Sequence, residues 1–226
     1  MKLSNYQLLA LLQLVSPSLP VGAYSYSEGL ESLVEQEIIT DAGGLDHWLR
    51  RELRYGAIQL EGGVMVRSHS CLLTQDWQGL NHWNQWLSAT RETRELRQQS
   101  WQMGDSLLKL WTKVQPEGRA MIEQITPPCH YAIAFTLAAT LGQIPPESFI
   151  LGYLHSWATN MINGGVKLIP LGQTQGQQLL FNLSPLLDKI TAQLLSSSED
   201  DLETCSWGAT LASMYHETQY TRLFRS

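Results

Sequence analysis

Cysteine is scarce in this sequence: Cys71, Cys129 and Cys205 are the only three among 226 residues. They form an odd set with no Cys-x-x-Cys pair, so they indicate neither a disulfide framework nor a zinc ribbon. The composition therefore predicts a protein that folds without covalent or metal cross-links. A reducing, cytoplasmic setting fits this cysteine usage best.

Basic residues and long apolar runs are also in short supply. The 15 Lys and Arg residues are outnumbered by 21 Asp and Glu, which gives a net charge of -6, and no basic block is present. A nucleic-acid binder would normally present a basic face to phosphates. The longest weakly polar stretch, 132–144, falls short of the roughly 20 apolar residues that a spanning helix needs. Ser4 and Gln7 have capping-box spacing, so we interpret the first residues as an amphipathic helix and not as an export signal.

Complete catalytic motifs are missing as well. No G-x-x-x-x-G-K-[ST] loop occurs, which argues against nucleotide hydrolysis by this chain alone. Ser106 and Lys109 fit an S-x-x-K pattern, but the S-D-N and K-T-G motifs that accompany it in acyl-serine enzymes are absent. Ser25 and Ser27 lack a nucleophile elbow. A helical hydrolase or transferase that uses these serines is an alternative supported only by such partial matches.

Metal ligands are sparse in the same way. The six histidines include no H-x-x-x-H pair, and Cys129–His130 is the one adjacent pair of soft ligands. Alone this pair makes an incomplete site, which a second chain could complete across a symmetry axis. The interpretation that we favour is a cysteine at a helix start with a capping or surface histidine.

Helical spacing of apolar residues is what the sequence has in abundance. Strand-like alternation is nearly absent, 43% of the residues are hydrophobic, and no repeat or composition shift divides the chain. We expect an all-α, single-domain bundle of about ten helices over residues 1–226. The expected helices are 4–15, 22–36, two within 45–73 that break near Gly62 and Gly63, 76–90, 92–114, 130–142, one from Pro146 that weakens at Gly164 and Gly165, one starting at Ser184–Pro185 and one at Ser206, with a loop at 196–201.

Three segments are unusual without being catalytic. They are "SPSLPVGAYSYSEGLE" (16–31), "KLIPLGQTQGQQLL" (167–180) and "YTRLFRS" (220–226). The last segment is rich in aromatic residues and arginine, side chains that dominate binding hot spots. Together the three segments resemble the urease accessory protein UreF family, whose pattern near the start is Pro-(Ile/Val)-Gly-(Gly/Ala)-(Phe/Tyr)-x-x-Ser-x-Gly-(Leu/Ile)-Glu.

The resemblance implies a role as well as a fold. It implies an all-α homodimer without catalytic activity or a cofactor of its own. The family joins UreD (also called UreH) and the GTPase UreG in a complex that delivers nickel to apo-urease and governs the timing of GTP hydrolysis. The GTPase carries the phosphate-binding loop, which agrees with its absence here. A direct nickel carrier that uses Cys129 and His130 is the alternative within the same pathway.

The resemblance also suggests individual residues. Tyr24, Ser27, Glu28 and Glu31 are expected on a partner-facing surface, although Glu28 and Glu31 also fit an ordinary solvated helix face. Lys167 is expected to face the GTPase, or else to snorkel from a buried helix end. The tail, residues 218–226, is expected to dock on UreD/UreH, and its last five residues, 222–226, are expected to be mobile beforehand. Its expected contacts are Arg222, Leu223, Phe224 and Arg225, and the expected structural residues are Pro20, Gly22, Gly29, Pro170 and Gly172.

Overall fold

Helix α8 (Tyr131–Leu141) is largely buried among other helices. Its sequence, YAIAFTLAATL, is small and apolar on every side, and a helix of this kind is stable only when other elements surround it. In the computed structural model, which describes residues 3–226, α4 (Ala57–Thr74) and α6 (Arg94–Val114) pack against α8, and α1 (Asn5–Leu14) also contacts it. Eight of the eleven α8 residues are buried.

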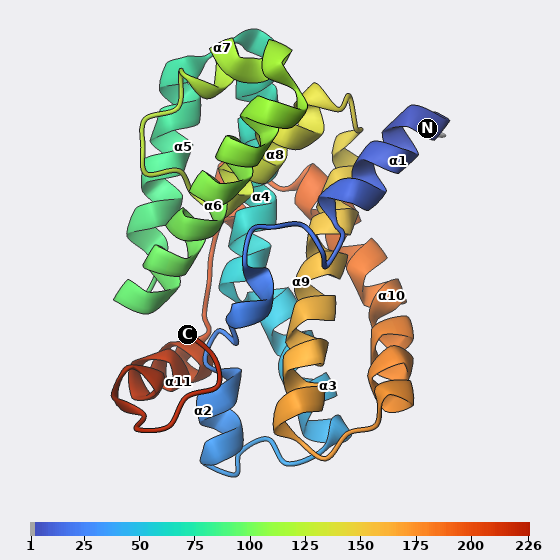
Figure 1. The fold of residues 1–226 in the computed structure, drawn as a ribbon, viewed down its shortest axis with the longest axis vertical. Coiled ribbons are helices and arrows are strands. Elements are labelled where there is room, and N and C mark those ends of the chain that lie inside the picture. Colours follow the sequence, from blue (N-terminus) through green and yellow to red (C-terminus); the bar gives the residue numbers. More distant parts are fainter. Residues whose placement is uncertain (1–2) are drawn as a thin grey trace.

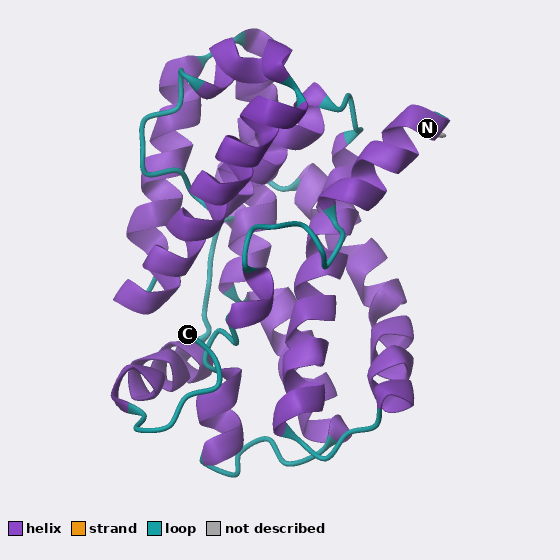
Figure 2. Cartoon of the chain, in the orientation of Figure 1, coloured by secondary structure: helices purple, strands orange, loops and turns teal. Residues whose placement is uncertain are grey.

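The described residues form helices joined by loops and contain no strand (Figures 1 and 2). The expected all-α class and about ten helices are therefore confirmed. Helix α9 (Pro146–Leu168) packs along α10 (Gln173–Ser196), α10 contacts α3 (Ala42–Tyr55), and α5 (Trp77–Thr90) lies against α4. The remaining elements are α2 (Leu30–Glu35), α7 (Arg119–Ile122), α11 (Trp207–Thr218) and the 3-10 turns η1 (Ala23–Ser25), η2 (Pro116–Gly118) and η3 (Glu199–Asp201).

Several helix ends follow the sequence signals. Ser4 and Gln7 form the expected capping box of α1, and Asp76 caps α5. Gly142 ends α8, and the following prolines begin α9. These signals are local side-chain or backbone preferences, which explains why they could be read from the sequence.

Two glycine signals were misinterpreted. The break between α3 and α4 falls at Gly56 and not at Gly62 and Gly63, which lie inside α4. A Cβ atom on Gly62 would lie 2.6 Å from Leu194 Cδ1, so this glycine allows α4 and α10 to approach closely. At Gly165 the same reason applies, since a Cβ atom there would lie 2.5 Å from Leu45 Cδ2, and α9 continues past it to Leu168.

Two expected starts were also wrong. Pro185 does not begin a helix but lies inside α10. The expected helix over 22–36 is instead the η1 turn followed by the short α2, because the backbone at Gly22, Glu28 and Gly29 adopts the left-handed conformation. This irregular path brings the opening segment beside α11 and the tail, at the lower left of Figure 1.

Candidate functional site

The tail packs onto the opening segment of its own chain. The carboxylate of Glu31 accepts the main-chain N–H of Leu223 at 2.6 Å and that of Phe224 at 2.9 Å. A main-chain oxygen of Ser226 accepts the N–H of Ser27 at 2.6 Å and also its hydroxyl at 2.6 Å. We call this set of contacts between residues 23–31 and the tail the clasp. It brings together segments that lie at opposite ends of the sequence.

Glycine allows the opening segment to take the path that the clasp requires. Gly29 has φ +86°, and a Cβ atom there would lie 2.9 Å from the main-chain nitrogen of Ser213. Gly22 has φ +81°, as expected from its place before the turn. Pro170 and Gly172 instead lie between α9 and α10, where Gly172 has the ordinary φ of -74° and caps α10.

Glu28 adopts a left-handed backbone conformation, with φ +52°, which is unusual for a residue with a side chain. Its carboxylate is held on both oxygens, by Gln99 Nε2 at 2.9 Å and by Trp157 Nε1 at 3.1 Å. The Arg91 guanidinium lies 4.0 Å from the same carboxylate. These contacts stabilise a backbone conformation that Glu28 would otherwise avoid. Glu28 is therefore anchored inward and does not lie on a solvated helix face.

Three polar contacts of His216 and Arg222 surround the tail. His216 is fully buried, with Nε2 3.3 Å from Glu31 Oε2 and Nδ1 2.9 Å from Glu95 Oε2. Arg222 Nη1 lies 2.8 Å from Glu95 Oε1. These contacts join the end of α11 to Glu31 of α2 and to Glu95 of α6.

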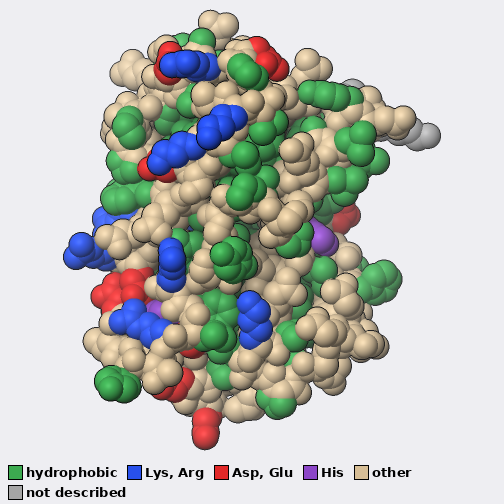
Figure 3. Space-filling model, in the orientation of Figure 1, with side chains coloured by type: hydrophobic (Ala, Val, Ile, Leu, Met, Phe, Trp, Pro, Cys, Tyr) green, Lys and Arg blue, Asp and Glu red, His purple; other side chains and the backbone are tan. Residues whose placement is uncertain are grey.

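Side chains of the tail alternate between the interior and the surface. Phe224 is 5% exposed, and its ring centroid lies 5.5 Å from Lys167 Nζ, within cation–π distance. Leu223 is 63% exposed, and Arg225 also points to solvent. Charges of both signs gather over this part of the surface (Figure 3). The tail therefore presents Leu223 outward because Phe224 is anchored inward.

This arrangement corrects part of what the sequence suggested. Ser27, Glu31 and Phe224 are buried, so they do not form an open surface in the isolated chain. A solvated helix face is also wrong for Glu31. The expected mobile tail is instead packed and hydrogen-bonded. The expected residues that do reach the surface are Tyr24, Lys167, Arg222, Leu223 and Arg225, while Pro20 is exposed in the preceding loop.

A buried charge cluster beneath the clasp was missed by sequence reasoning. Arg91 Nη2 lies 3.1 Å from Glu61 Oε1, and the Tyr153 hydroxyl donates to Glu61 Oε2 at 2.6 Å. Burial raises the pKa of Glu61, and the Arg91 guanidinium opposes that rise. Burial also raises the pKa of Tyr153 well above its usual value. The available signal was Glu61 itself, a carboxylate inside the apolar pattern of the first half of α4.

The structure contradicts the metal site suggested at Cys129 and His130. Both residues are buried, at 1% and 0% exposure, so a second chain could not reach them. His130 Nδ1 accepts the N–H of Ala132 at the start of α8, which confirms the capping interpretation. Burial and the nearby Arg91 hold the pKa of His130 well below its usual value, and burial raises that of Cys129. Residues 3–226 contain no group of three or more His, Cys, Asp or Glu arranged to hold a metal.

The candidate nucleophiles bond to main-chain oxygens and not to a base. Ser25 Oγ donates to Gly22 O at 2.7 Å, and Ser106 Oγ donates to Gln102 O at 2.7 Å. Ser27 Oγ is part of the clasp. A nucleophilic serine needs a base within hydrogen-bond reach, and these contacts provide none.

Comparison with known proteins gives consistent results. The family model described as UreF matches residues 39–184. "Urease accessory protein UreF" of Trichormus variabilis is 55% identical over 224 residues, covering 99% of this chain and 98% of the relative. The proteins of the same name from Nostoc sp. and Microcystis aeruginosa are 56% and 54% identical over 224 residues, covering 99% of this chain and 98% and 100% of the relatives. Separately, none of the described helices is both long and apolar enough to cross a membrane.

Proposed function

This chain belongs to the UreF family of urease accessory proteins and so has a role in urease maturation, and we propose that it fills this role as a non-catalytic bridge. In this proposal a cytoplasmic homodimer joins UreD/UreH to the GTPase UreG. The complex inserts nickel into apo-urease, and the bridge regulates when UreG hydrolyses GTP.

The clasp is the observation that supports this proposal most. It joins segments 16–31 and 220–226, which are two of the three segments that carry the family resemblance. Lys167, from the third segment, contacts the Phe224 ring. Four hydrogen bonds, two to Glu31 and two between Ser27 and Ser226, fix a short tail whose outward side chains include Leu223 and Arg225. Binding costs less when the binding segment is already ordered, because less conformational entropy is lost. We therefore assign the outer face of the tail, with Tyr24, to UreD/UreH.

Lys167 links this surface to a second one. It is exposed near the end of α9, and its ammonium group lies over the ring of Phe224. We assign the solvent side of Lys167 to UreG. Lys167 contacts Phe224, which is part of the tail. If the tail shifts when UreD/UreH binds, Phe224 moves with it, and the Lys167 side chain has to change its position. That coupling is a physical route by which one partner could influence the GTPase.

The assignment of UreD/UreH is tested by replacing an outward side chain. Leu223→Asp places a charge on the outer face of the tail without removing an interior group, and Val114→Asp is the matched control because Val114 is also exposed, at 43%. Each tagged variant is co-expressed with UreD/UreH and UreG and purified under identical conditions. We expect Leu223→Asp to lose UreD/UreH and Val114→Asp to retain it. Equal recovery of UreD/UreH by both variants, with both folded by circular dichroism, would contradict the assignment.

A further inference from the structure

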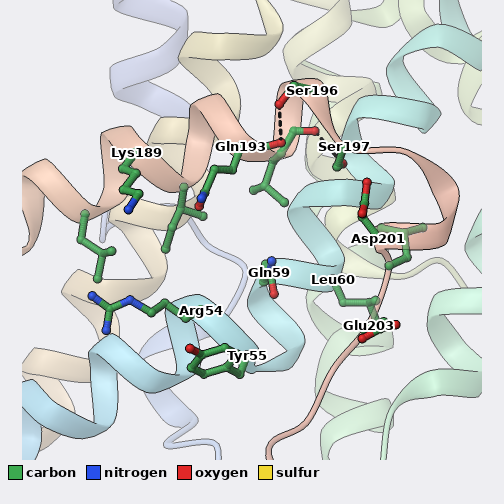
Figure 4. Close-up of a pocket in the computed structure, with 14 residues that line it drawn as sticks. Arg54, Tyr55, Gln59, Leu60, Lys189, Gln193, Ser196, Ser197, Asp201 and Glu203 are labelled. Carbon is green, nitrogen blue, oxygen red and sulfur yellow. Dashed lines mark hydrogen bonds between the residues drawn. The ribbon is translucent and has the colours of Figure 1, made fainter.

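A groove between the end of α3 and the second half of α10 has the features of a binding site. It has a volume of about 560 Å³, which lies within the range of about 300–1,000 Å³ typical of ligand sites. Its walls are the end of α3, the start of α4, the second half of α10 and the linker that contains η3 (Figure 4). Its floor is apolar and consists of Leu60, Leu186, Ile190, Leu194 and Leu202.

Two cations reach into one end of this groove. Arg54 comes from α3 and Lys189 from α10, and both extend into the space between these helices (Figure 4). Within residues 3–226, no carboxylate lies within 4.0 Å of either cation. Two unpaired cations that line the same groove repel each other, and an anion placed between them would remove that repulsion. The protein as a whole carries a net charge of -6, so this local excess of positive charge is not a general property of its surface.

The opposite end of the groove is acidic, and the middle is uncharged and polar. Asp201 and Glu203 line the acidic end. Gln59 and Gln193 project from α4 and α10 between the two ends, and neither side-chain amide has a hydrogen-bond partner among the described residues. Each amide offers a donor and an acceptor, the pair of groups that a peptide main chain also carries.

We propose that this groove binds an extended segment of a partner protein that carries an acidic residue near one end and a basic residue near the other. A carboxylate of the segment lies between Arg54 and Lys189, its main chain bonds to Gln59 and Gln193, and an apolar side chain covers the leucine-rich floor. A basic residue further along the segment faces Asp201 and Glu203. The order of these groups along the groove favours a chain with separated charges over a compact anion, which would use only the basic end.

The proposal can be tested by nuclear magnetic resonance on the full chain labelled with ¹⁵N. The probe is the peptide acetyl-Glu-Leu-Gly-Leu-Lys-amide, titrated to about 10 mM so that a Kd near 1 mM is measurable. The same peptide with Gln in place of Glu is the control. We expect the glutamate peptide to shift the side-chain signals of Arg54, Gln59 and Gln193. The glutamine peptide should bind roughly fivefold more weakly, as expected for the loss of one exposed ion pair.

Protein variants give an independent comparison. Arg54→Gln and Lys189→Gln should each weaken binding of the glutamate peptide by a similar factor. Lys113→Gln, at an exposed site on α6, should leave that binding unchanged. Equal binding of the two peptides, shifts confined to residues outside the groove, or no shift at all would each overturn the proposal. Inorganic phosphate is titrated separately. Should phosphate alone perturb Arg54 as strongly as the peptide does, with Gln59 and Gln193 unaffected in both titrations, the groove would be an anion site only and the peptide assignment would fail.

Discussion

Glu31 holds Phe224 in place across 193 residues of sequence, with its Oε2 atom 2.9 Å from the main-chain nitrogen of Phe224. The same oxygen lies 3.3 Å from His216 Nε2. One buried carboxylate thus determines both the course of the tail and its attachment to α11. The account of the site depends on this relationship, because it explains why Leu223 faces outward.

Replacing Glu31 with Gln should release the tail. An amide has one oxygen in place of two, so its NH₂ group would face an N–H donor of Leu223 or Phe224. We expect the free energy of unfolding in urea to fall by about 2 kcal/mol or more, since hydrogen bonds to charged groups are involved. Amide hydrogen exchange at Leu223 and Phe224 should accelerate as well. Glu35→Gln, on the exposed side of α2, is the control and should change neither quantity. Unchanged exchange at both amides in Glu31→Gln would show that the carboxylate does not hold the tail.

Phe224 and Leu223 are neighbours in the tail, but replacing each of them should affect the stability of the fold differently. Phe224→Ala removes a buried ring and should lower the free energy of unfolding by about 3 kcal/mol. Leu223→Ala removes an exposed side chain and should change it by less than about 0.5 kcal/mol. Urea denaturation of both variants measures the difference. A similar loss in both, or in neither, would mean that the tail is not packed as described.

Gly29 should not tolerate alanine. Its φ of +86° is unfavourable for any residue with a Cβ atom, and that atom would meet the main-chain nitrogen of Ser213. We expect Gly29→Ala to lower the free energy of unfolding by about 1–3 kcal/mol. Gly208 is the matched control, because it lies in α11 with open space around it, and alanine there should raise stability by about 0.5–1 kcal/mol. Thermal unfolding compares the melting temperatures of the two variants, and we expect that of Gly29→Ala to be the lower. A higher melting temperature for Gly29→Ala would contradict the described backbone.

Glu52 should make stability depend on pH. Burial raises the pKa of Glu52 from its ordinary 4.5 to about 7, although a hydrogen bond from Ser206 opposes the rise. The folded protein therefore binds the proton more tightly than the unfolded chain, and the stability that the neutral form contributes is lost as the pH rises through about 7. Glu52→Gln abolishes this loss. At pH 8 we expect the variant to be more stable than the wild type by up to about 3 kcal/mol, with little difference near pH 4.5. Urea unfolding at several pH values checks this, and a difference that does not vary with pH would refute it.

The sequence was informative where local chemistry determines structure. Asp76 and Gly142 mark helix ends through interactions within one turn, so α5 and α8 were predicted well. The sequence was misleading where the reason for a residue is its contact with a residue far away in the chain. Gly62 looks like a helix breaker, but it is needed because Leu194 of α10 packs against it.

The same distinction applies to the site. The opening segment and the tail could be recognised as unusual from their residues alone. Their contact could not, because the pairing of Glu31 with Leu223 spans 192 residues and no local pattern encodes it. Arg91 and Glu61 were missed for a related reason, since each charge is explained only by the other.

The affinity of Glu31→Gln for UreD/UreH tests the central claim most directly, because Glu31 is only 6% exposed and its carboxylate supports the tail from beneath while adding little to the surface. The Kd is measured for the wild type, Glu31→Gln and Glu35→Gln by the same titration, at a temperature where all three are folded. If the clasp orders the tail for binding, Glu31→Gln should raise the Kd at least tenfold, equivalent to about 1.4 kcal/mol. Glu35→Gln should match the wild type. A Glu31→Gln protein that binds UreD/UreH as tightly as the wild type would contradict the account.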